Sequence, residues 1–337
     1  MKKEKRVVSM IEKLLDPASL PDPTTTVTLV QTHISSVLVA DRFVYKIKKP
    51  VNFGFLDFST LEKRRYYCQQ EVRLNQRLSR EIYLGVLPVL QEGDRFRIGE
   101  GRGATVEYAV KMKRISEQVL MKTMFREGRL KNEHLDAIAL LLARFHADAE
   151  RSPEIDSFGE PEKFKINTDE NFQQTERYTG KTVKQQDYLA LRAWTDGFFL
   201  KNEALFRERI QKGKVRDCHG DLHMEHICLT DPVSVIDCIE FNERFRYSDT
   251  LSDIAFLLMD LEYHGGRDQA ARLWEAYQAE SGERNVEELL VFYKVYRAYV
   301  RGKVNSFQLD DERLPVVEKE RIARQAAAYF DLARSYI

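Results

Sequence analysis

Two aspartates near residue 230 have the type and spacing needed for chemistry on a hydroxyl group. Residues 227–229 and 233–236 are short apolar runs separated by Thr-Asp-Pro, which predicts two strands joined by a tight turn. Such a hairpin would bring Asp221, before the first strand, beside Asp237, after the second. One carboxylate can orient a hydroxyl group while the other holds a metal ion. The alternative is a polar loop that only caps strands.

Three histidines in the same segment allow a second interpretation. His219, His223 and His226 lie close to Asp221 in the sequence, and this spacing suits zinc if the loop is compact. Against a zinc hydrolase, the sequence has no H-E-x-x-H pattern, and loop histidines often serve only as hydrogen-bond partners of the backbone.

The elements that must position these residues differ between the two parts of the chain. Up to residue 115, β-branched and aromatic runs separated by turn residues such as Ser35-Ser36 predict strands, with one long helix between them. The expected strands cover residues 27–34, 37–40, 43–48, 86–90, 95–98 and 105–112, and the expected helices cover residues 5–15 and 62–78.

The remaining sequence is mainly helical in its pattern, and only residues 215–237 are strand-like. The expected helices cover residues 135–149, 188–210, 251–263, 269–280, 286–304 and 315–336. The fold class is therefore α+β. We expect an N-terminal helix and linker over residues 1–26, a β-rich lobe over 27–115 and a helical lobe over 116–337.

Composition excludes several classes of protein. The 337 residues include 53 Lys+Arg and 53 Asp+Glu, so no overall positive field attracts nucleic acid or an anionic membrane. The longest uncharged apolar runs are too short to cross a bilayer. Four cysteines without a C-x-x-C pair indicate buried thiols in a reducing compartment, and we expect a cytoplasmic protein.

The motif HGDLH at residues 219–223, followed by VID at 235–237, resembles the aminoglycoside phosphotransferase family, relatives of protein kinases. The sequences YKIKKPVNFGF at 45–55 and DCIEFN at 237–242 resemble a bacterial branch often fused to a C-terminal P-loop ATPase-like domain. Because the chain has no G-x-x-x-x-G-K-[ST], we expect that domain to be absent. The resemblance implies a protein-kinase-like, two-lobed fold. It also implies an enzyme that uses ATP together with Mg²⁺, with Mn²⁺ as an alternative metal ion.

The resemblance also implies roles for residues around the motif. Asp221 is the catalytic aspartate that accepts the proton of the substrate hydroxyl, Asp237 is a metal ligand, and Asp253 braces the catalytic loop. Where the family usually has asparagine as a metal ligand, this chain has His226. A neutral imidazole can ligate a divalent ion but favours softer metals than Mg²⁺, so His226 either coordinates or only donates a hydrogen bond.

In kinase-like folds a strand lysine holds the α- and β-phosphates and pairs with a helix glutamate. Lys46 on the third expected strand is the candidate lysine, and Lys48 shares its face because side chains alternate along a strand. Glu71 resembles the helix partner best, and Glu62 is second.

The remaining nucleotide contacts are implied by position. No G-x-G-x-x-G lies between the first two strands, and Ser35 and Ser36 occupy the place of the phosphate-covering loop. The adenine-binding hinge falls at Met112, Lys113 and Ile115, where backbone groups alone suffice.

Charged residues in the second part bear on the acceptor. Lys294, Arg297 and Arg301 share one face of the helix expected at residues 286–304, either as a solvated surface or, for the two arginines, as a site for an anionic substrate group. Conversely, Glu240 and Glu243 could meet an amine. The sequence therefore leaves the acceptor and the oligomeric state open.

The sequence favours an ATP-dependent phosphotransferase acting on a small hydroxylated molecule. The alternatives are a catalytically weak nucleotide-binding regulatory module and, third, a zinc hydrolase.

Overall fold

The computed structural model describes residues 9–337, which divide into two compact units. The first unit contains the described residues up to Thr123 together with residues 228–243, and the second contains residues 124–227 and 244–337. The main sheet lies in the first unit and long helices dominate the second, which confirms the α+β class. The lobe boundary that we place near residue 115 stays a prediction.

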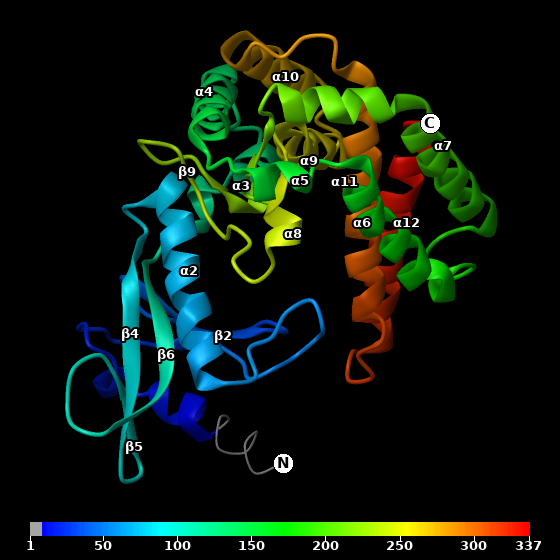
Figure 1. Ribbon diagram of the computed structural model, residues 1–337. Coiled ribbons are helices and arrows are strands. Elements are labelled where there is room, and N and C mark those ends of the chain that lie inside the picture. The colour runs from blue at the N-terminus through cyan, green and yellow to red at the C-terminus, as the bar shows by residue number, and fades with distance from the viewer. Residues whose placement is uncertain (1–8) are drawn as a thin grey trace. The chain divides into compact units, whose positions relative to one another are not determined.

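Six antiparallel strands of the first unit form one sheet in the order β1-β2-β3-β6-β4-β5. The strands are β1 (Thr28–Gln31), β2 (Ser35–Val39), β3 (Phe43–Lys48), β4 (Tyr83–Glu92), β5 (Arg95–Ile98) and β6 (Ala104–Lys113). Helix α2 (Leu61–Ser79) lies alongside β4 and β6 (Figure 1). Residues 9–14 are helical, as expected, and residues 5–8 of that expected helix lie outside the described residues.

The alternation of side chains along β3 separates a core face from a charged face. Tyr45 and Ile47 are buried in an apolar cluster with residues such as Leu14 and Leu38. Lys46 and Lys48 project to the other face and contact α2. A period of two in the sequence therefore places both lysines on the side of the sheet that α2 covers.

The first turn of the sheet lies three residues earlier than expected. Ser35 and Ser36 begin β2, and the turn consists of residues 32–34. The hydroxyl of Thr32 accepts hydrogen bonds from the backbone N–H of Ile34 (3.3 Å) and of Ser35 (2.9 Å). This threonine turn competes with strand pairing and ends β1 early, so the expected Ser35-Ser36 turn is wrong.

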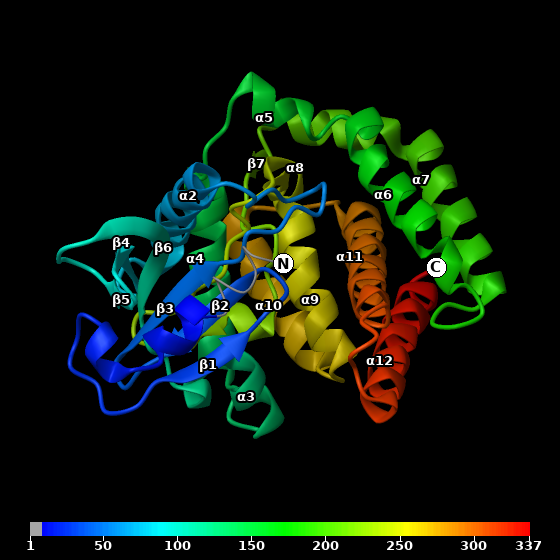
Figure 2. The same ribbon diagram turned by 90° about the horizontal axis from the view of Figure 1, so that it is seen from below.

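Helices of several lengths form the second unit, and Figure 2 shows α11 between α9 and α12. They are α4 (Asn132–Asp148), α5 (Pro153–Ser157), α6 (Pro161–Thr175), α7 (Gln185–Gln211), α9 (Thr250–Tyr263), α10 (Arg267–Ser281), α11 (Glu287–Gln308) and α12 (Val316–Ser335). Helices α3 (Met121–Arg126) and α8 (Glu243–Arg246) begin where the chain enters this unit. Among the described residues, we find no helix that combines the length and apolar character needed to cross a lipid bilayer.

The motif segment lies where the chain passes from the second unit back to the first. Strand β7 (Val215–Asp217) pairs with β10 (Tyr247–Asp249) at its start. The short strands β8 (Ile227–Cys228) and β9 (Ser234–Val235) then form the expected hairpin. All four cysteines are buried.

Candidate active site

Two lysines and three carboxylates form a compact group in the first unit, here called the lysine–carboxylate cluster: Lys46, Lys48, Glu71, Asp237 and Glu240. Lys46 Nζ lies 2.9 Å from Glu71 Oε1 and 2.7 Å from Asp237 Oδ1. Lys48 Nζ lies 2.6 Å from Glu71 Oε2 and also contacts Glu240 Oε1. Glu71, fully buried on α2, therefore bridges both lysines, whereas Glu62, the other expected partner, is exposed in the first turn of the helix.

The two lysines differ in what they can reach. The Lys46 side chain is 16% exposed, and its partner Asp237 is 45% exposed. Lys48 is 1% exposed, and its ammonium lies 4.8 Å from the centre of the Phe58 ring. Lys46 can thus meet a ligand from solvent, whereas Lys48 is enclosed by its own unit.

Asp237 adopts an unusual backbone conformation, with φ of +63°. Aspartate and asparagine tolerate this left-handed region better than most residues. The Asp237 N–H donates to the hydroxyl of Tyr83 on β4 (3.1 Å), and the next N–H, of Cys238, donates to Asn75 Oδ1 on α2 (2.9 Å). Sequence reasoning missed Tyr83 and Asn75 because they act on the backbone of a segment more than 150 residues away.

The electrostatics of the cluster favour an additional cation. Burial alone would lower the pKa of Lys46, but the charges of Asp237 and Glu71 outweigh it and raise that pKa well above its ordinary value. Burial would raise the pKa of Glu71, yet Lys46 and Lys48 lower it. Burial raises the pKa of Glu240 although Lys48 opposes it. When Glu240 is ionised as well, three carboxylates face two ammonium groups, which leaves one negative charge in excess. A divalent cation at the exposed carboxylate of Asp237 would offset it, and carboxylate oxygen is a ligand that Mg²⁺ prefers.

In the second unit, buried side chains hold the loop that contains His219, Gly220 and Asp221. The backbone N–H groups of His219 and Gly220 donate to the carboxylate of Asp253 at 2.7 and 2.9 Å. From α11, Arg297 Nη1 donates to Gly220 O at 2.7 Å. Asp253 is fully buried, with His146 Nε2 3.4 Å from its Oδ2. It therefore braces the loop, as the resemblance predicts.

Asp221 lies beside two histidine side chains. Its Oδ2 is 3.6 Å from His223 Nε2 and 3.6 Å from His226 Nδ1. Burial would raise the pKa of Asp221, but the charges of His223, His226 and Arg301 outweigh it and lower that pKa below its ordinary value. Asp221 is therefore ionised at neutral pH.

The hydrogen bond of His226 fixes which ring nitrogen can bind a metal. His226 Nδ1 lies 2.8 Å from the backbone oxygen of Asp221. A carbonyl oxygen only accepts, so Nδ1 carries the hydrogen and the neutral ring has its lone pair on Nε2. Asp221, His223 and His226 could each offer one ligand atom within 4.8 Å of the others. His219 is not part of that group, and the expected zinc set is therefore reduced to these three residues.

The expected nucleotide contacts all lie in the first unit. Ser35 and Ser36 are buried, and the Ser35 hydroxyl has no hydrogen-bond partner among the described residues. Met112 and Lys113 end β6, and Lys113 N–H donates to Ile82 O at 2.9 Å. Ile115 packs with Met112 on the apolar cluster beneath α2.

Three charged residues considered for substrate binding are already paired. Lys294 Nζ lies 2.6 Å from Glu262 Oε1, and Arg297 is buried against the loop, so the solvated-surface interpretation is wrong for both. Glu240 is buried and paired with Lys48, so it is not available to meet an amine. Glu243 is exposed.

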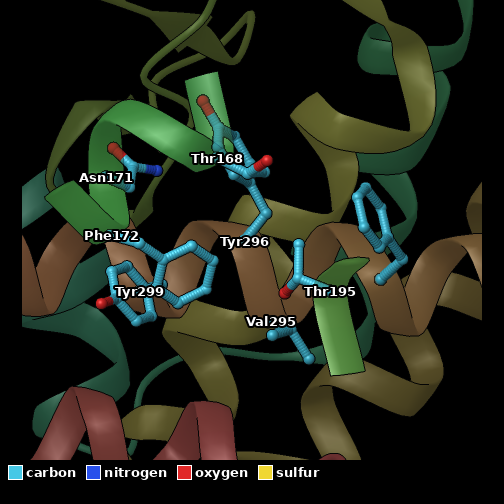
Figure 3. Close-up of a pocket in the computed structure, with 8 residues that line it drawn as sticks. Thr168, Asn171, Phe172, Thr195, Val295, Tyr296 and Tyr299 are labelled. Carbon is cyan, nitrogen blue, oxygen red and sulfur yellow. The ribbon is translucent and has the colours of Figure 1, made fainter. Parts of the chain in front are cut away.

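A small hollow lies among α6, α7 and α11 (Figure 3). It encloses about 260 Å³ of empty space, part of it open to solvent, and Phe172, Tyr296 and Tyr299 form much of its wall. Its interior has room for only about one water molecule. The hollow is too small and too apolar to hold a hydroxylated acceptor and its polar contacts.

Sequence comparison finds relatives across most of the chain. A profile described as the phosphotransferase enzyme family matches residues 67–289. Uncharacterized proteins of Mycobacterium tuberculosis and Mycobacterium bovis are 35% identical over 275 residues, which cover 81% of this chain and 53% of theirs. The chain therefore spans about half the length of the curated relatives it matches.

Solved structures with a similar fold are distant in sequence. A choline/ethanolamine kinase family protein from Mesorhizobium loti has a TM-score of 0.53 at 13% identity. The match covers 99% of this chain and 100% of that protein's chain. A thermostable mutant of an aminoglycoside phosphotransferase has a TM-score of 0.50 at 12% identity, and the match covers 96% of this chain and 98% of that protein's chain. At such identities the likeness concerns the fold alone, and it confirms the kinase-like fold class.

Proposed function

Because the chain belongs to the phosphotransferase enzyme family, as its motifs predict, we propose that it transfers the γ-phosphoryl group of ATP to a hydroxyl group of a small molecule. The observation that carries this proposal is the contact of Lys46 with both Glu71 and Asp237. A strand lysine paired with a helix glutamate, beside a metal-binding aspartate, is the arrangement by which kinases hold ATP. Lys46 is preferred to Lys48 because Lys48 is enclosed with Glu240.

In this proposal the residues of the first unit bind ATP and those of the second orient the acceptor. Lys46 would hold the α- and β-phosphates and Asp237 would hold Mg²⁺ or Mn²⁺. His226 is the second candidate metal ligand, through Nε2, and the alternative is that it only donates a hydrogen bond. The bound metal ion would supply positive charge that neutralises the phosphates. Asp221 orients the acceptor: a bond forms between the acceptor oxygen and the γ-phosphorus, the bond from that phosphorus to the β-phosphate oxygen breaks, and the hydroxyl proton passes to Asp221.

The remaining nucleotide contacts follow from the same proposal. The backbone at Met112, Lys113 and Ile115 binds adenine, and the turn before Ser35 and Ser36 covers the phosphates. We also place the protein in the cytoplasm, where ATP is available and four buried cysteines stay reduced.

The β1–β2 turn favours a second candidate, a nucleotide-binding module with weak catalysis. The N–H groups of Ile34 and Ser35 already donate to the Thr32 hydroxyl. Fewer backbone donors are then available to grip phosphate than in a glycine-rich loop. This candidate binds ATP and transfers its phosphate slowly or not at all.

Two measurements on the same preparation test the proposal. The first titrates ATP with and without Mg²⁺, and the second follows ADP release while aminoglycosides, amino sugars, sugars and amino alcohols are offered as acceptors. We expect Mg²⁺-dependent ATP binding and ADP release that one acceptor class stimulates. ATP binding without stimulated turnover would support the second candidate instead, and tight stoichiometric zinc without ATP affinity would support a zinc hydrolase.

A further inference from the structure

Arg301 is the basic residue of the α11 face that the structure leaves without an ion-paired carboxylate. On the same face, Lys294 is paired with Glu262 and Arg297 is held by the catalytic loop. Arg301 follows Arg297 by one helical turn, and its side chain is half-buried. Among the described residues, we find no carboxylate joined to it by a hydrogen bond or ion pair, and its Nε–H is a buried donor without a partner.

The position of Arg301 is fixed by its neighbours. Its guanidinium carbon lies 5.6 Å from the centre of the Tyr329 ring on α12. One turn earlier, Arg297 binds the oxygen of Gly220, the residue before Asp221. Helical spacing therefore directs Arg301 toward the same loop, and its charge contributes to the lowered pKa of Asp221.

Such an arginine suits a negatively charged ligand. A half-buried guanidinium has lost some of its hydrogen bonds to water, and hydrogen bonds to an anionic group replace them. The opposite assignment, an acceptor whose amine meets Glu240, is disfavoured because Glu240 is buried against Lys48.

We propose that the acceptor carries an anionic group, a carboxylate or a phosphate monoester, that Arg301 binds while Asp221 receives the reacting hydroxyl. The inference rests on the proposed phosphotransferase function and narrows its substrate class. It argues against polycationic aminoglycosides as the natural acceptors, since an ammonium group would meet the positive charge of Arg301.

Matched acceptors test the charge preference in the wild-type protein. Glycerate is compared with glycerol for the carboxylate, glucose 6-phosphate with glucose for the phosphate monoester, and choline and kanamycin represent cations. We expect at least one anionic acceptor to exceed its neutral partner by about 10- to 100-fold in kcat/KM, the range of one charge-assisted hydrogen bond. The pair that shows the difference identifies which anion is bound. A neutral or cationic acceptor that works best would overturn the inference while leaving the phosphotransferase function intact.

Substitutions then separate binding from structure. Arg301→Gln should raise KM for the anionic acceptor about 10- to 100-fold, leave KM for ATP unchanged, and leave the neutral partner unaffected, with partial rescue in Arg301→Lys. Arg324→Gln, an exposed arginine on α12, is the matched control. The charges of Asp221 and Asp260 both act on Arg301. An equal loss with every acceptor would show that Arg301 only compensates these two carboxylates, and would overturn the inference. If Arg301→Gln does not fold, the wild-type comparison alone decides. No ATP binding and no turnover with any acceptor would overturn the proposed function and this inference together.

Discussion

Asp237 combines a strained backbone with the most exposed carboxylate of the lysine–carboxylate cluster. Its φ of +63° is held by hydrogen bonds from two successive N–H groups to Tyr83 and Asn75. Strain of this kind persists where the surroundings over-determine it, which is common at functional sites. The choice of substitution therefore matters, because asparagine keeps the backbone preference while it removes the charge.

We expect Asp237→Asn to abolish Mg²⁺-dependent ATP binding, because the lost charge is the one that offsets the metal. Asp221→Asn should leave ATP binding nearly intact and slow turnover by about 10²- to 10⁴-fold, as for other positioned bases. Calorimetric titration of ATP with and without Mg²⁺, beside steady-state kinetics, measures both effects. Equal loss of ATP binding in the two variants would contradict this division of roles.

Glu71 is the residue on which both lysines of the cluster depend. Glu71→Gln would leave the buried ammonium of Lys48 and the partly exposed one of Lys46 facing fewer charges. Breaking a buried pair in this way costs about 3 to 5 kcal/mol of unfolding free energy. Glu62→Gln, on the exposed first turn of the same helix, should change it by less than about 0.5 kcal/mol. Urea unfolding of both variants checks the difference. A similar small change in both would show that the cluster is not a stabilising network.

At the scale of elements, the sequence predicts strands and helices that have a regular apolar pattern, and it does not predict a helix whose buried face is mostly polar. The sequence predicts β3 and β5 with their observed bounds, because β-branched and aromatic runs between turn residues mark them clearly. The sequence pattern does not predict helix α6, because most of its buried residues are polar, as in Asn167 and Asn171, and the helical apolar stripe is absent.

The same contrast applies to the site. The motif singles out Asp221 and Asp237 because the resemblance that it carries lies in local sequence. The preference for Lys46 over Lys48 depends on burial against Phe58 and Glu240, which pattern alone does not contain. Whether these residues perform the assigned roles stays a prediction.

The contact of Asp253 on α9 with the loop at His219 and Gly220 should appear in acid unfolding. Burial would raise the pKa of Asp253, but the hydrogen bond and charge of His146, with other nearby charges, lower it from 3.8 to about 2. A lowered pKa means that Asp253 stabilises the fold fully above about pH 4, and that this contribution is lost as the pH falls toward 2.

We therefore expect Asp253→Asn to lower the free energy of unfolding at pH 7 by about 2 to 3 kcal/mol, since charge-assisted hydrogen bonds to the loop are weakened. The variant should also lose less stability than the wild type between pH 4 and pH 2.5. Urea midpoints across this range measure the effect. Parallel pH profiles for the two proteins would show that the Asp253 carboxylate does not titrate as its surroundings require.

At the scale of the whole molecule, the motif straddles a crossing of the chain between units. Asp221 and His226 belong to the second unit, and Asp237 and Glu240 belong to the first, although only sixteen positions separate Asp221 from Asp237. A continuous stretch of sequence thus contributes to two separately packed bodies. Segment 228–243 depends on long-range contacts, such as those of Tyr83 and Asn75, to fold with the first.

One buried cysteine in each unit allows the opening of that unit to be measured by its rate of alkylation. Burial raises the pKa of Cys68 to about 12 in the first unit and raises that of Cys218 above its ordinary value in the second. Only a thiolate reacts with iodoacetamide, so alkylation requires exposure first. With the other three cysteines replaced by alanine, we expect Cys68 or Cys218 alone to react at least about 10³-fold more slowly than in the unfolded chain. Different alkylation rates in the two variants would reveal a unit that opens without the other, and rates as fast as in the unfolded chain would contradict the burial of these thiols.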